Sequence, residues 1–218
     1  MLQLDIAAGT GLRHLLCIGA HCDDIEIGCG ATVLRLIERH PELHVDWVIL
    51  TSTPARAAEA RASAAGFLGG VRSHNVVIRE FRDGFLPWVG SDLKDCFEEL
   101  KRSTRPELIL THHRGDFHQD HRLIGELTWN TWRDHLILEY EIPKYDGDLG
   151  RPNAFVPLTE AVVRRKVDLI LGSFASQAQK AWFTADTFRA LLRLRGVEAN
   201  APEGLAEAFF APKVCLTL

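Results

Sequence analysis

Two stretches of the sequence hold side chains that could bind a metal ion and move protons. In the first, His21, Asp23 and Asp24 directly follow the apolar run 15–20. Two adjacent acids at the end of a buried segment are unfavourable unless a cation or hydrogen bonds compensate them. A zinc ion would do so by taking a nitrogen from His21 and an oxygen from one aspartate. Alternatively, the aspartates cap a following helix. This is the preferred interpretation when the stretch is considered alone.

The second stretch, 112–121, contains four of the ten histidines. His118 and His121 are three residues apart, so they would share one face at the start of a helix. Asp120 lies between them, where a carboxylate could orient a neighbouring imidazole. The alternatives are a polar surface stretch that opens a helix and an adventitious metal-binding tract. Four histidines at the end of one buried strand weaken both alternatives.

Short apolar segments alternate with helical ones along the chain, and this alternation indicates how the two stretches are positioned. We expect strands at 15–20, 45–50, 75–81 and 108–111, and helices at 31–39, 55–68, 93–102 and 121–132. The pattern predicts an α/β, Rossmann-like fold with a mostly parallel sheet sandwiched by helices. Such sheets bind ligands at the carboxyl ends of their strands. Both histidine groups follow strands, so we expect them at the same edge of the sheet.

The rest of the chain is less regular. Prolines and glycines interrupt 137–155, which predicts a strand leading into a long ordered loop over the same edge. We expect further helices at 160–174 and 185–195 and a closing strand at 206–214. Because the sequence contains no repeat, low-complexity segment or linker, residues 1–218 are predicted to form a single domain.

Composition excludes several classes of protein. The chain is 46% hydrophobic and 25% charged, as in soluble globular proteins, and its net charge of −4 argues against a nucleic-acid partner. We find no signal-peptide pattern and no apolar run long enough to span a bilayer, so no membrane partner is expected. The five cysteines lack Cys-x-x-Cys spacing, which favours a reducing, cytoplasmic location over a disulfide framework. A monomer and a homo-oligomer are both compatible with these observations.

Together the two stretches resemble the metal motifs of the LmbE-like, or PIG-L, zinc de-N-acetylases. The first motif of that family reads Ala-His-Pro-Asp-Asp with a glycine behind it, and residues 20–24 here read Ala-His-Cys-Asp-Asp, with Gly30 behind them. The second motif is a His-x-Asp-His run, which is found here at 118–121. The pair is far more specific than either half. The resemblance extends over most of the chain and is strongest up to residue 132.

The resemblance implies an LmbE-like fold and a set of roles. Asp23 would be the general base, and His118 would be the partner acid or the oxyanion stabiliser, supported by Asp120. The implied reaction is hydrolysis of an acetamide by a metal-bound water, which releases acetate and a free amine. One Zn²⁺ per chain is implied, although iron or cobalt could occupy such a site. The implied metal ligands are His21, Asp24 and His121.

The substrate implied by the resemblance is a small N-acetylated amino sugar. It would be of the N-acetylglucosamine type, carried on a nucleotide or belonging to an antibiotic or polysaccharide precursor. The stretch 140–153 mixes aromatic and polar residues, which suits a sugar. Arg56 could instead form a helix-surface ion pair with Glu59, and Asp116 stands where some relatives have a substrate-contacting tyrosine. The residues expected to contact substrate are Arg56, Asp116, Tyr140 and Lys144.

Other residues in or near these motifs are interpreted as structural or as possible phosphate ligands. Cys22 stands where the family has proline, and adjacent ligands at 21 and 22 would crowd one ion, so we expect a structural cysteine. Gly28 and Gly30 lack the third glycine of a dinucleotide loop, and we expect them to let a helix pack closely on the sheet. Basic residues that could bind a phosphate group, or could simply be solvated, are Lys144, Arg151, Arg193 and Arg195.

Three functions are compatible with the sequence. A zinc N-deacetylase acting on an amino sugar accounts for all the motif residues. A hydrolase of another amide, such as a thiol conjugate, would use the same site and differ in the 140–153 loop. A non-catalytic nucleotide-binding module of similar fold would need neither a metal nor the pair Asp23 and His118, which counts against it.

Overall fold

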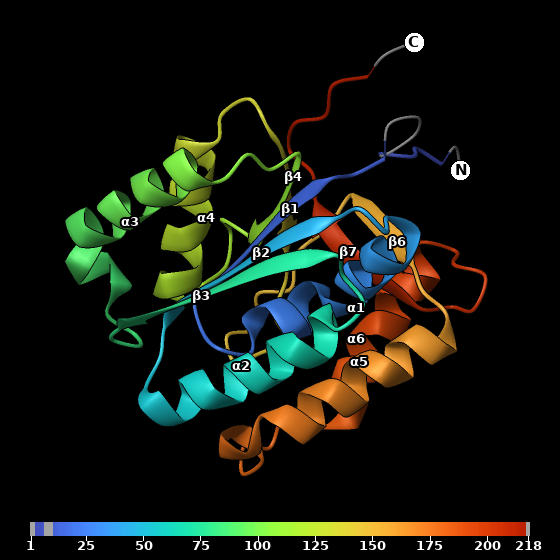
Figure 1. Cartoon of the computed structure of the whole chain (residues 1–218). Coiled ribbons are helices and arrows are strands. Elements are labelled where there is room, and N and C mark those ends of the chain that lie inside the picture. The colour runs from blue at the N-terminus through green and yellow to red at the C-terminus, as the bar shows by residue number, and fades with distance from the viewer. Residues whose placement is uncertain (1–2, 7–10, 217–218) are drawn as a thin grey trace.

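The computed structural model describes residues 3–6 and 11–216 and shows a seven-stranded sheet between two layers of helices (Figure 1). The strand order is β3-β2-β1-β4-β5-β7-β6. Neighbouring strands are parallel from β3 to β5, and β7 is antiparallel to both β5 and β6. The strands are β1 (His14–Gly19), β2 (His44–Thr51), β3 (Ser73–Phe81), β4 (Leu108–His112), β5 (Leu136–Tyr140), β6 (Ala154–Pro157) and β7 (Ala206–Phe210). The predicted mostly parallel α/β fold is confirmed.

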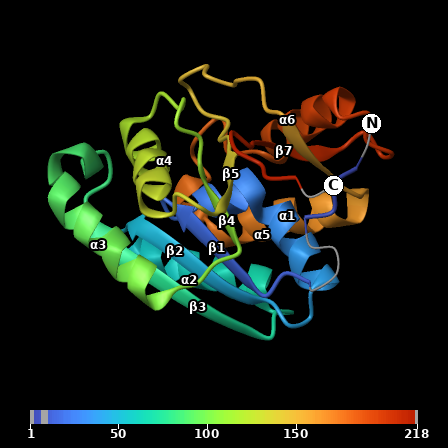
Figure 2. The same ribbon diagram turned by 90° about the horizontal axis from the view of Figure 1, so that it is seen from above.

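Each face of the sheet is covered by its own group of helices (Figures 1 and 2). Because side chains alternate along a strand, Leu15 and Cys17 of β1 pack into one core, and Leu16 and Ile18 pack into the other. The first core includes α1 (Asp24–Arg39), α2 (Pro54–Leu68), α5 (Glu160–Ser173) and α6 (Ala185–Glu198). The second includes α3 (Gly90–Ser103) and α4 (Gln119–Thr131). No helix of the described residues is long and apolar enough to cross a membrane.

The sheet order brings the two histidine stretches to one edge. β1 and β4 are adjacent and parallel, and the connections that leave them run to opposite faces of the sheet. This reversal is where α/β sheets place their ligand sites. The backbone nitrogen of Ala20, just after β1, donates to Nε2 of His112 at the end of β4 over 3.0 Å. The expectation that both groups share this edge is confirmed.

Most element boundaries differ from the predictions by at most three residues, and three differences are larger. Helix α1 begins at Asp24 rather than at residue 31, so Gly28 and Gly30 lie inside the helix and not in the loop before it. A Cβ atom at Gly28 would lie 2.2 Å from the ring of Tyr140, and one at Gly30 would lie 2.7 Å from Phe67. The close packing on the sheet that was expected of both glycines is confirmed for Gly28, which faces β5, whereas Gly30 packs against α2. The closing strand ends at residue 210 rather than 214, and the predicted 137–155 loop ends in an unpredicted edge strand, β6.

A buried ion pair ties α5 and β7 to the middle of α1. Nζ of Lys166 lies 2.6 Å from Oε1 of Glu207 and 2.6 Å from the Ile27 carbonyl oxygen, and both side chains are 2% exposed. The Glu207 carboxylate also accepts hydrogen bonds from the backbone nitrogens of Ala31 and Thr32, over 2.9 and 2.6 Å. Every charged group in this contact is compensated, which is the condition for a buried pair to be tolerated.

Removing the lysine should destabilise the fold strongly. We expect Lys166→Met to lower the free energy of unfolding by about 3–5 kcal/mol, because Glu207 would remain buried without its cation. The matched control is Arg189→Met, which breaks the solvent-exposed Arg189–Glu160 pair and should lower the free energy of unfolding far less. Urea denaturation of both variants measures the difference. Equal effects would contradict a special role for the buried pair.

Candidate active site

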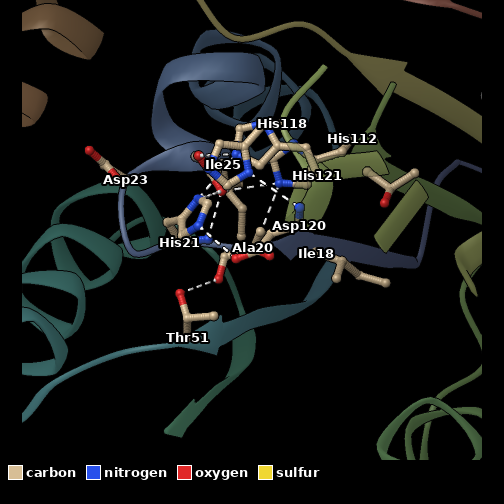
Figure 3. A network of polar contacts seen from close by, with 12 residues as sticks. Ile18, Ala20, His21, Asp23, Ile25, Thr51, His112, His118, Asp120 and His121 are labelled. Carbon is tan, nitrogen blue, oxygen red and sulfur yellow. Dashed lines mark hydrogen bonds and ion pairs between the residues drawn. The ribbon is translucent and has the colours of Figure 1, made fainter. Parts of the chain in front are cut away.

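Three side chains converge from three elements at the carboxyl edge of β1 and β4. His21 follows β1, Asp24 begins α1, and His121 lies in the first turn of α4. Nδ1 of His21 is 3.1 Å from Nε2 of His121 and 3.2 Å from Oδ2 of Asp24, and His121 Nε2 is 3.5 Å from Oδ1 of Asp24. All three residues are less than 9% exposed, and Figure 3 shows the imidazoles of His21, His118, His112 and His121 clustered together.

The spacing of these donor atoms fits a small divalent metal. Tetrahedral zinc with bonds of about 2.0 Å holds its ligand atoms about 3.3 Å apart, which is close to the separations found here. Burial and neighbouring His112 lower the pKa of His121 to about 4, so its ring is neutral, as a metal ligand must be. Burial opposes ionisation of Asp24, but His121, His112 and His21 hold the pKa of this carboxyl well below its usual range. Burial opposes protonation of His21, but Asp24 and Asp120 hold the pKa of this ring well above its usual value, so it would lose a proton when a metal binds. The types and spacing of the donors fit zinc.

Two further carboxylates fix the orientation of the histidines. Nδ1 of His121 is 3.0 Å from Oδ2 of Asp116, so its hydrogen points to Asp116 and its Nε2 lone pair faces Asp24. Nε2 of His21 faces Oδ2 of Asp120 at 3.4 Å, which leaves Nδ1 for the cluster. Carboxylates placed in this way commonly orient metal-bound imidazoles. Asp116, expected to touch substrate, instead orients His121, and the Asp120 carboxylate, expected to support His118, contacts His21.

Asp120 also holds the loop that follows β3. Its two carboxylate oxygens accept hydrogen bonds from the backbone nitrogens of Gly84 and Leu86, over 2.7 and 3.2 Å. This contact brings Asp83 to the site, where its Oδ1 lies 3.0 Å from Nε2 of His21 while its side chain stays 63% exposed. We did not predict Asp83. Its position just after a parallel strand was the signal that could have identified it.

His112 is a second residue that sequence reasoning left without a role. Its fully buried ring stacks on His121 with centroids 4.0 Å apart, and its Nε2 is 3.1 Å from Oδ2 of Asp24. One ligand atom each from Asp24, His112 and His121 lies within 4.8 Å of the others, so this set overlaps the predicted one. His112 therefore lies beside Asp24 and His121 within the cluster.

Asp23 is paired with Arg56 rather than acting as a helix cap. Its side chain makes no capping hydrogen bond to α1, and its Oδ1 accepts from an Arg56 guanidinium nitrogen over 2.8 Å. Burial raises the pKa of Asp23, although Arg56 opposes the rise. The ion pair considered between Arg56 and Glu59 is not made, because Glu59 accepts hydrogen bonds from the backbone and hydroxyl of Ser176. The guanidinium group of Arg56 therefore contacts the candidate base Asp23.

His118 caps α4 with its own side chain. Nδ1 accepts a hydrogen bond from the backbone nitrogen of Asp120 over 3.3 Å, which places the ring hydrogen on Nε2. The His118 ring stands edge-on to His21, with centroids 4.9 Å apart. Burial and the nearby His21 lower the pKa of His118, which favours the neutral ring. A neutral imidazole with a free Nε2–H is a hydrogen-bond donor at the edge of the cluster.

Two of the residues predicted to contact substrate are occupied elsewhere. Tyr140 is fully buried against α1, and its hydroxyl donates to the carbonyl oxygen of Ile18 over 2.7 Å. Nζ of Lys144 lies 3.0 Å from Asp116 and 2.6 Å from Asp148, so this lysine joins the 141–153 loop to the site instead of facing solvent. The structure assigns Tyr140 to packing and Lys144 to holding the loop.

Arg195 and Cys22 are also structural. Arg195, considered for a phosphate, forms a two-pronged pair with the Glu141 carboxylate over 2.6 and 2.7 Å, and its side chain is 4% exposed. The Cys22 thiol points to the carbonyl oxygen of Thr51 over 3.5 Å. Burial raises the pKa of this thiol to about 12, so it stays protonated and is a poor metal ligand. The expected structural role of Cys22 agrees with this geometry.

The sequence of the chain is similar to a known family and to a curated protein. The family model described as GlcNAc-PI de-N-acetylase (PIG-L) matches residues 16–132, just over half of the chain, and includes both motifs. The chain is 30% identical over 151 residues to the "Uncharacterized deacetylase YaiS" of Escherichia coli K12, an alignment that covers 63% of this chain and 78% of that protein.

Solved structures with the same fold differ in the reactions that they are named for. The N,N'-diacetylchitobiose deacetylase of Pyrococcus horikoshii superposes with a TM-score of 0.65 at 19% identity, covering 91% of this chain and 83% of its own. The 4-carboxy-2-hydroxymuconate hydratase GalB of Pseudomonas putida superposes with a TM-score of 0.75 at 18% identity, covering 95% of this chain and all of its own. At these identities the likeness establishes the fold alone.

Proposed function

Because the chain belongs to the PIG-L (LmbE-like) deacetylase family, we propose that it is a zinc-dependent hydrolase that removes the N-acetyl group of an amino sugar. The observation that carries the proposal is the buried cluster of His21, Asp24 and His121, in which the two facing imidazole nitrogens lie 3.1 Å apart and each is within 3.5 Å of one of the two Asp24 carboxylate oxygens. Asp23, which precedes Asp24 in the chain and is also buried, is a carboxylate that a site serving only to hold a metal would not need.

The metal would be held by Nδ1 of His21, a carboxylate oxygen of Asp24 and Nε2 of His121. When bound, zinc supplies Lewis-acid chemistry: it lowers the pKa of water and polarises a carbonyl group. Asp116 and Asp120 keep the two imidazoles turned toward that position through their hydrogen bonds to the opposite ring nitrogens. Three protein ligands leave room for water and the substrate.

Asp23 transfers protons in the proposed reaction, and His118 stabilises the negative charge that develops on the substrate oxygen. Asp23 takes the proton of the attacking water and delivers it to the amide nitrogen as the C–N bond breaks, so acetate and an amine leave. Its raised pKa brings it closer to the value that suits a general base. His118 donates its Nε2–H to the oxygen that gains negative charge, a role for which its cap-fixed tautomer is suited. Arg56 holds Asp23 in place.

An amino-sugar substrate is supported by two features. The structural relative from Pyrococcus horikoshii is named as a deacetylase of N,N'-diacetylchitobiose, a substrate of this class. At the edge of the site, the Asp83 carboxylate is 63% exposed and stands next to His21, where it could accept hydrogen bonds from sugar hydroxyls. We keep other amides, such as thiol conjugates, as alternatives for the test below.

A substrate panel tests the proposal. The zinc-loaded protein would be incubated with N-acetylglucosamine, N,N'-diacetylchitobiose, a nucleotide-linked N-acetyl sugar and an acetylated thiol conjugate, and both acetate and free amine would be quantified. We expect equal amounts of the two products from at least one sugar and from no other amide. Hydrolysis of the thiol conjugate alone would overturn the sugar assignment, and no acetate from any compound would contradict the proposed hydrolase.

The orientation of His121 should control zinc affinity. We expect Asp116→Asn to weaken zinc binding by roughly 10–100-fold, because the charge that orients and polarises the His121 ring is lost. Asp148→Asn is the matched control, since Asp148 also pairs with Lys144 whereas Asp116 is the carboxylate that faces His121. Competition with a zinc chelator measures both affinities. A similar loss in both variants would assign the effect to the loop instead of to His121.

A further inference from the structure

A second group of potential metal ligands lies at the opposite end of the sheet. His14 begins β1, and His44 and Asp46 lie at the start of β2. One ligand atom from each of these three residues lies within 4.8 Å of the others. Six residues of β1 at ~3.3 Å each separate His14 from Ala20, so roughly 20 Å lies between this group and the candidate active site. The proposed reaction uses none of these residues.

The strand register explains why the three side chains meet. His14 pairs with His44 across the parallel strands, and Leu16 pairs with Asp46. Residues two apart on a strand point to the same face, so all three side chains lie on the face covered by α3 and α4. Nε2 of His14 is 2.6 Å from Oδ2 of Asp46, and Nε2 of His44 is 3.6 Å from Oδ1 of the same carboxylate. Three donor atoms therefore surround one small volume.

The surroundings of the group have the features of a built metal site. Nδ1 of His44 is 2.8 Å from the Ser73 hydroxyl, which turns Nε2 toward Asp46. The Asn75 amide nitrogen donates to Oδ1 of Asp46 over 3.3 Å, which fixes the carboxylate. Histidine and carboxylate metal ligands commonly have such partners on their outer atoms. Asp46 is buried while both histidines keep some exposure, so an ion could enter from solvent.

We propose that His14, His44 and Asp46 bind a second divalent metal ion, for which zinc is the best-fitting candidate. Two imidazoles and one carboxylate suit zinc, with nickel and copper as competitors. A neutral imidazole can carry its hydrogen on either nitrogen, so a cation can replace the hydrogen between His14 Nε2 and Asp46. Through these ligands and Ser73, the ion would join the first residues of β1, β2 and β3.

Zinc titration of the metal-free full-length protein tests the site, with zinc alone as the probe. We expect the wild type to bind two equivalents and His44→Gln to bind one. Ser73→Ala keeps every ligand and should weaken the second equivalent by roughly 10–100-fold, because only the partner of His44 is removed. His74→Gln is the matched control, since His74 is an exposed neighbour on β3 outside the group, and it should bind two equivalents.

The same titration separates this site from the candidate active site. His21→Ala should keep one equivalent, and zinc should still raise the melting temperature of that variant. Zinc should give no such rise when His44→Gln is added to His21→Ala. A wild type that binds only one equivalent, lost in His21→Ala, would overturn the second site. Two equivalents that persist in His44→Gln would overturn it as well. One equivalent that survives His21→Ala and disappears in His44→Gln would support this site and contradict the catalytic one.

Discussion

Asp23→Asn should lower kcat/KM by about 10²–10⁴-fold, the range expected for losing a positioned general base, while zinc content stays the same. Asparagine keeps the shape of the side chain but cannot accept the proton of the attacking water. Asp24 would still be surrounded by its three histidines, so the proposed metal ligands are untouched. The predicted signature is a loss of turnover with no loss of metal.

Acetate release at saturating and limiting substrate, measured beside metal analysis, checks this result. Asp95→Asn makes the same chemical change on the exposed surface of α3 and should leave both quantities unchanged. Full activity in Asp23→Asn would remove Asp23 from the role of base. Loss of zinc in that variant would show that Asp23 contributes to metal binding instead.

His21→Ala should abolish both zinc binding at the candidate active site and activity. The substitution removes one of three ligands and also the ring that faces Asp120 and Asp83. Because carbonyl polarisation and water activation both depend on the metal, the activity loss should exceed that of Asp23→Asn. His74→Ala, at an exposed position on β3, is the control and should keep metal and activity.

The measurement is metal content per chain after dialysis, with acetate release on the same samples. Activity that persists in the zinc-free variant would separate the reaction from the metal. Zinc retained in His21→Ala with the second site removed by His44→Gln would show that His21 is not a ligand.

The position of the site could be predicted because it follows from topology. Residues that end two adjacent parallel strands must meet at one edge, so His21 and His121, which are 100 positions apart, were expected to lie together. The alternation of apolar segments and helices predicted the parallel sheet and the shared edge, whereas the adjacency of β1 and β4 came from the structure. The start of α1 was placed too late because glycines favour loops locally, whereas here the contacts of Gly28 with Tyr140 and of Gly30 with Phe67 decide the structure.

The partners of individual side chains could not be predicted in the same way. A carboxylate between two histidines can orient either one, and Asp120 contacts His21 because the 83–86 loop and the start of α4 meet beside β1. Asp116 and Lys144 pair with each other, and no spacing rule predicts a contact between two loops. For Tyr140 a signal existed: it is two residues from Leu138 on β5, so it shares the buried face toward α1.

Metal bound at the His21, Asp24 and His121 cluster is expected to make this chain a deacetylase. The most direct test of this expectation is acetate release from an N-acetylated amino sugar by metal-stripped protein as zinc is added back, with His44→Gln used to leave one metal site. We expect no release from the stripped protein and activity that rises until one equivalent of zinc is bound. Equal release with and without zinc, or none at full occupancy on every acetylated sugar tried, would contradict it.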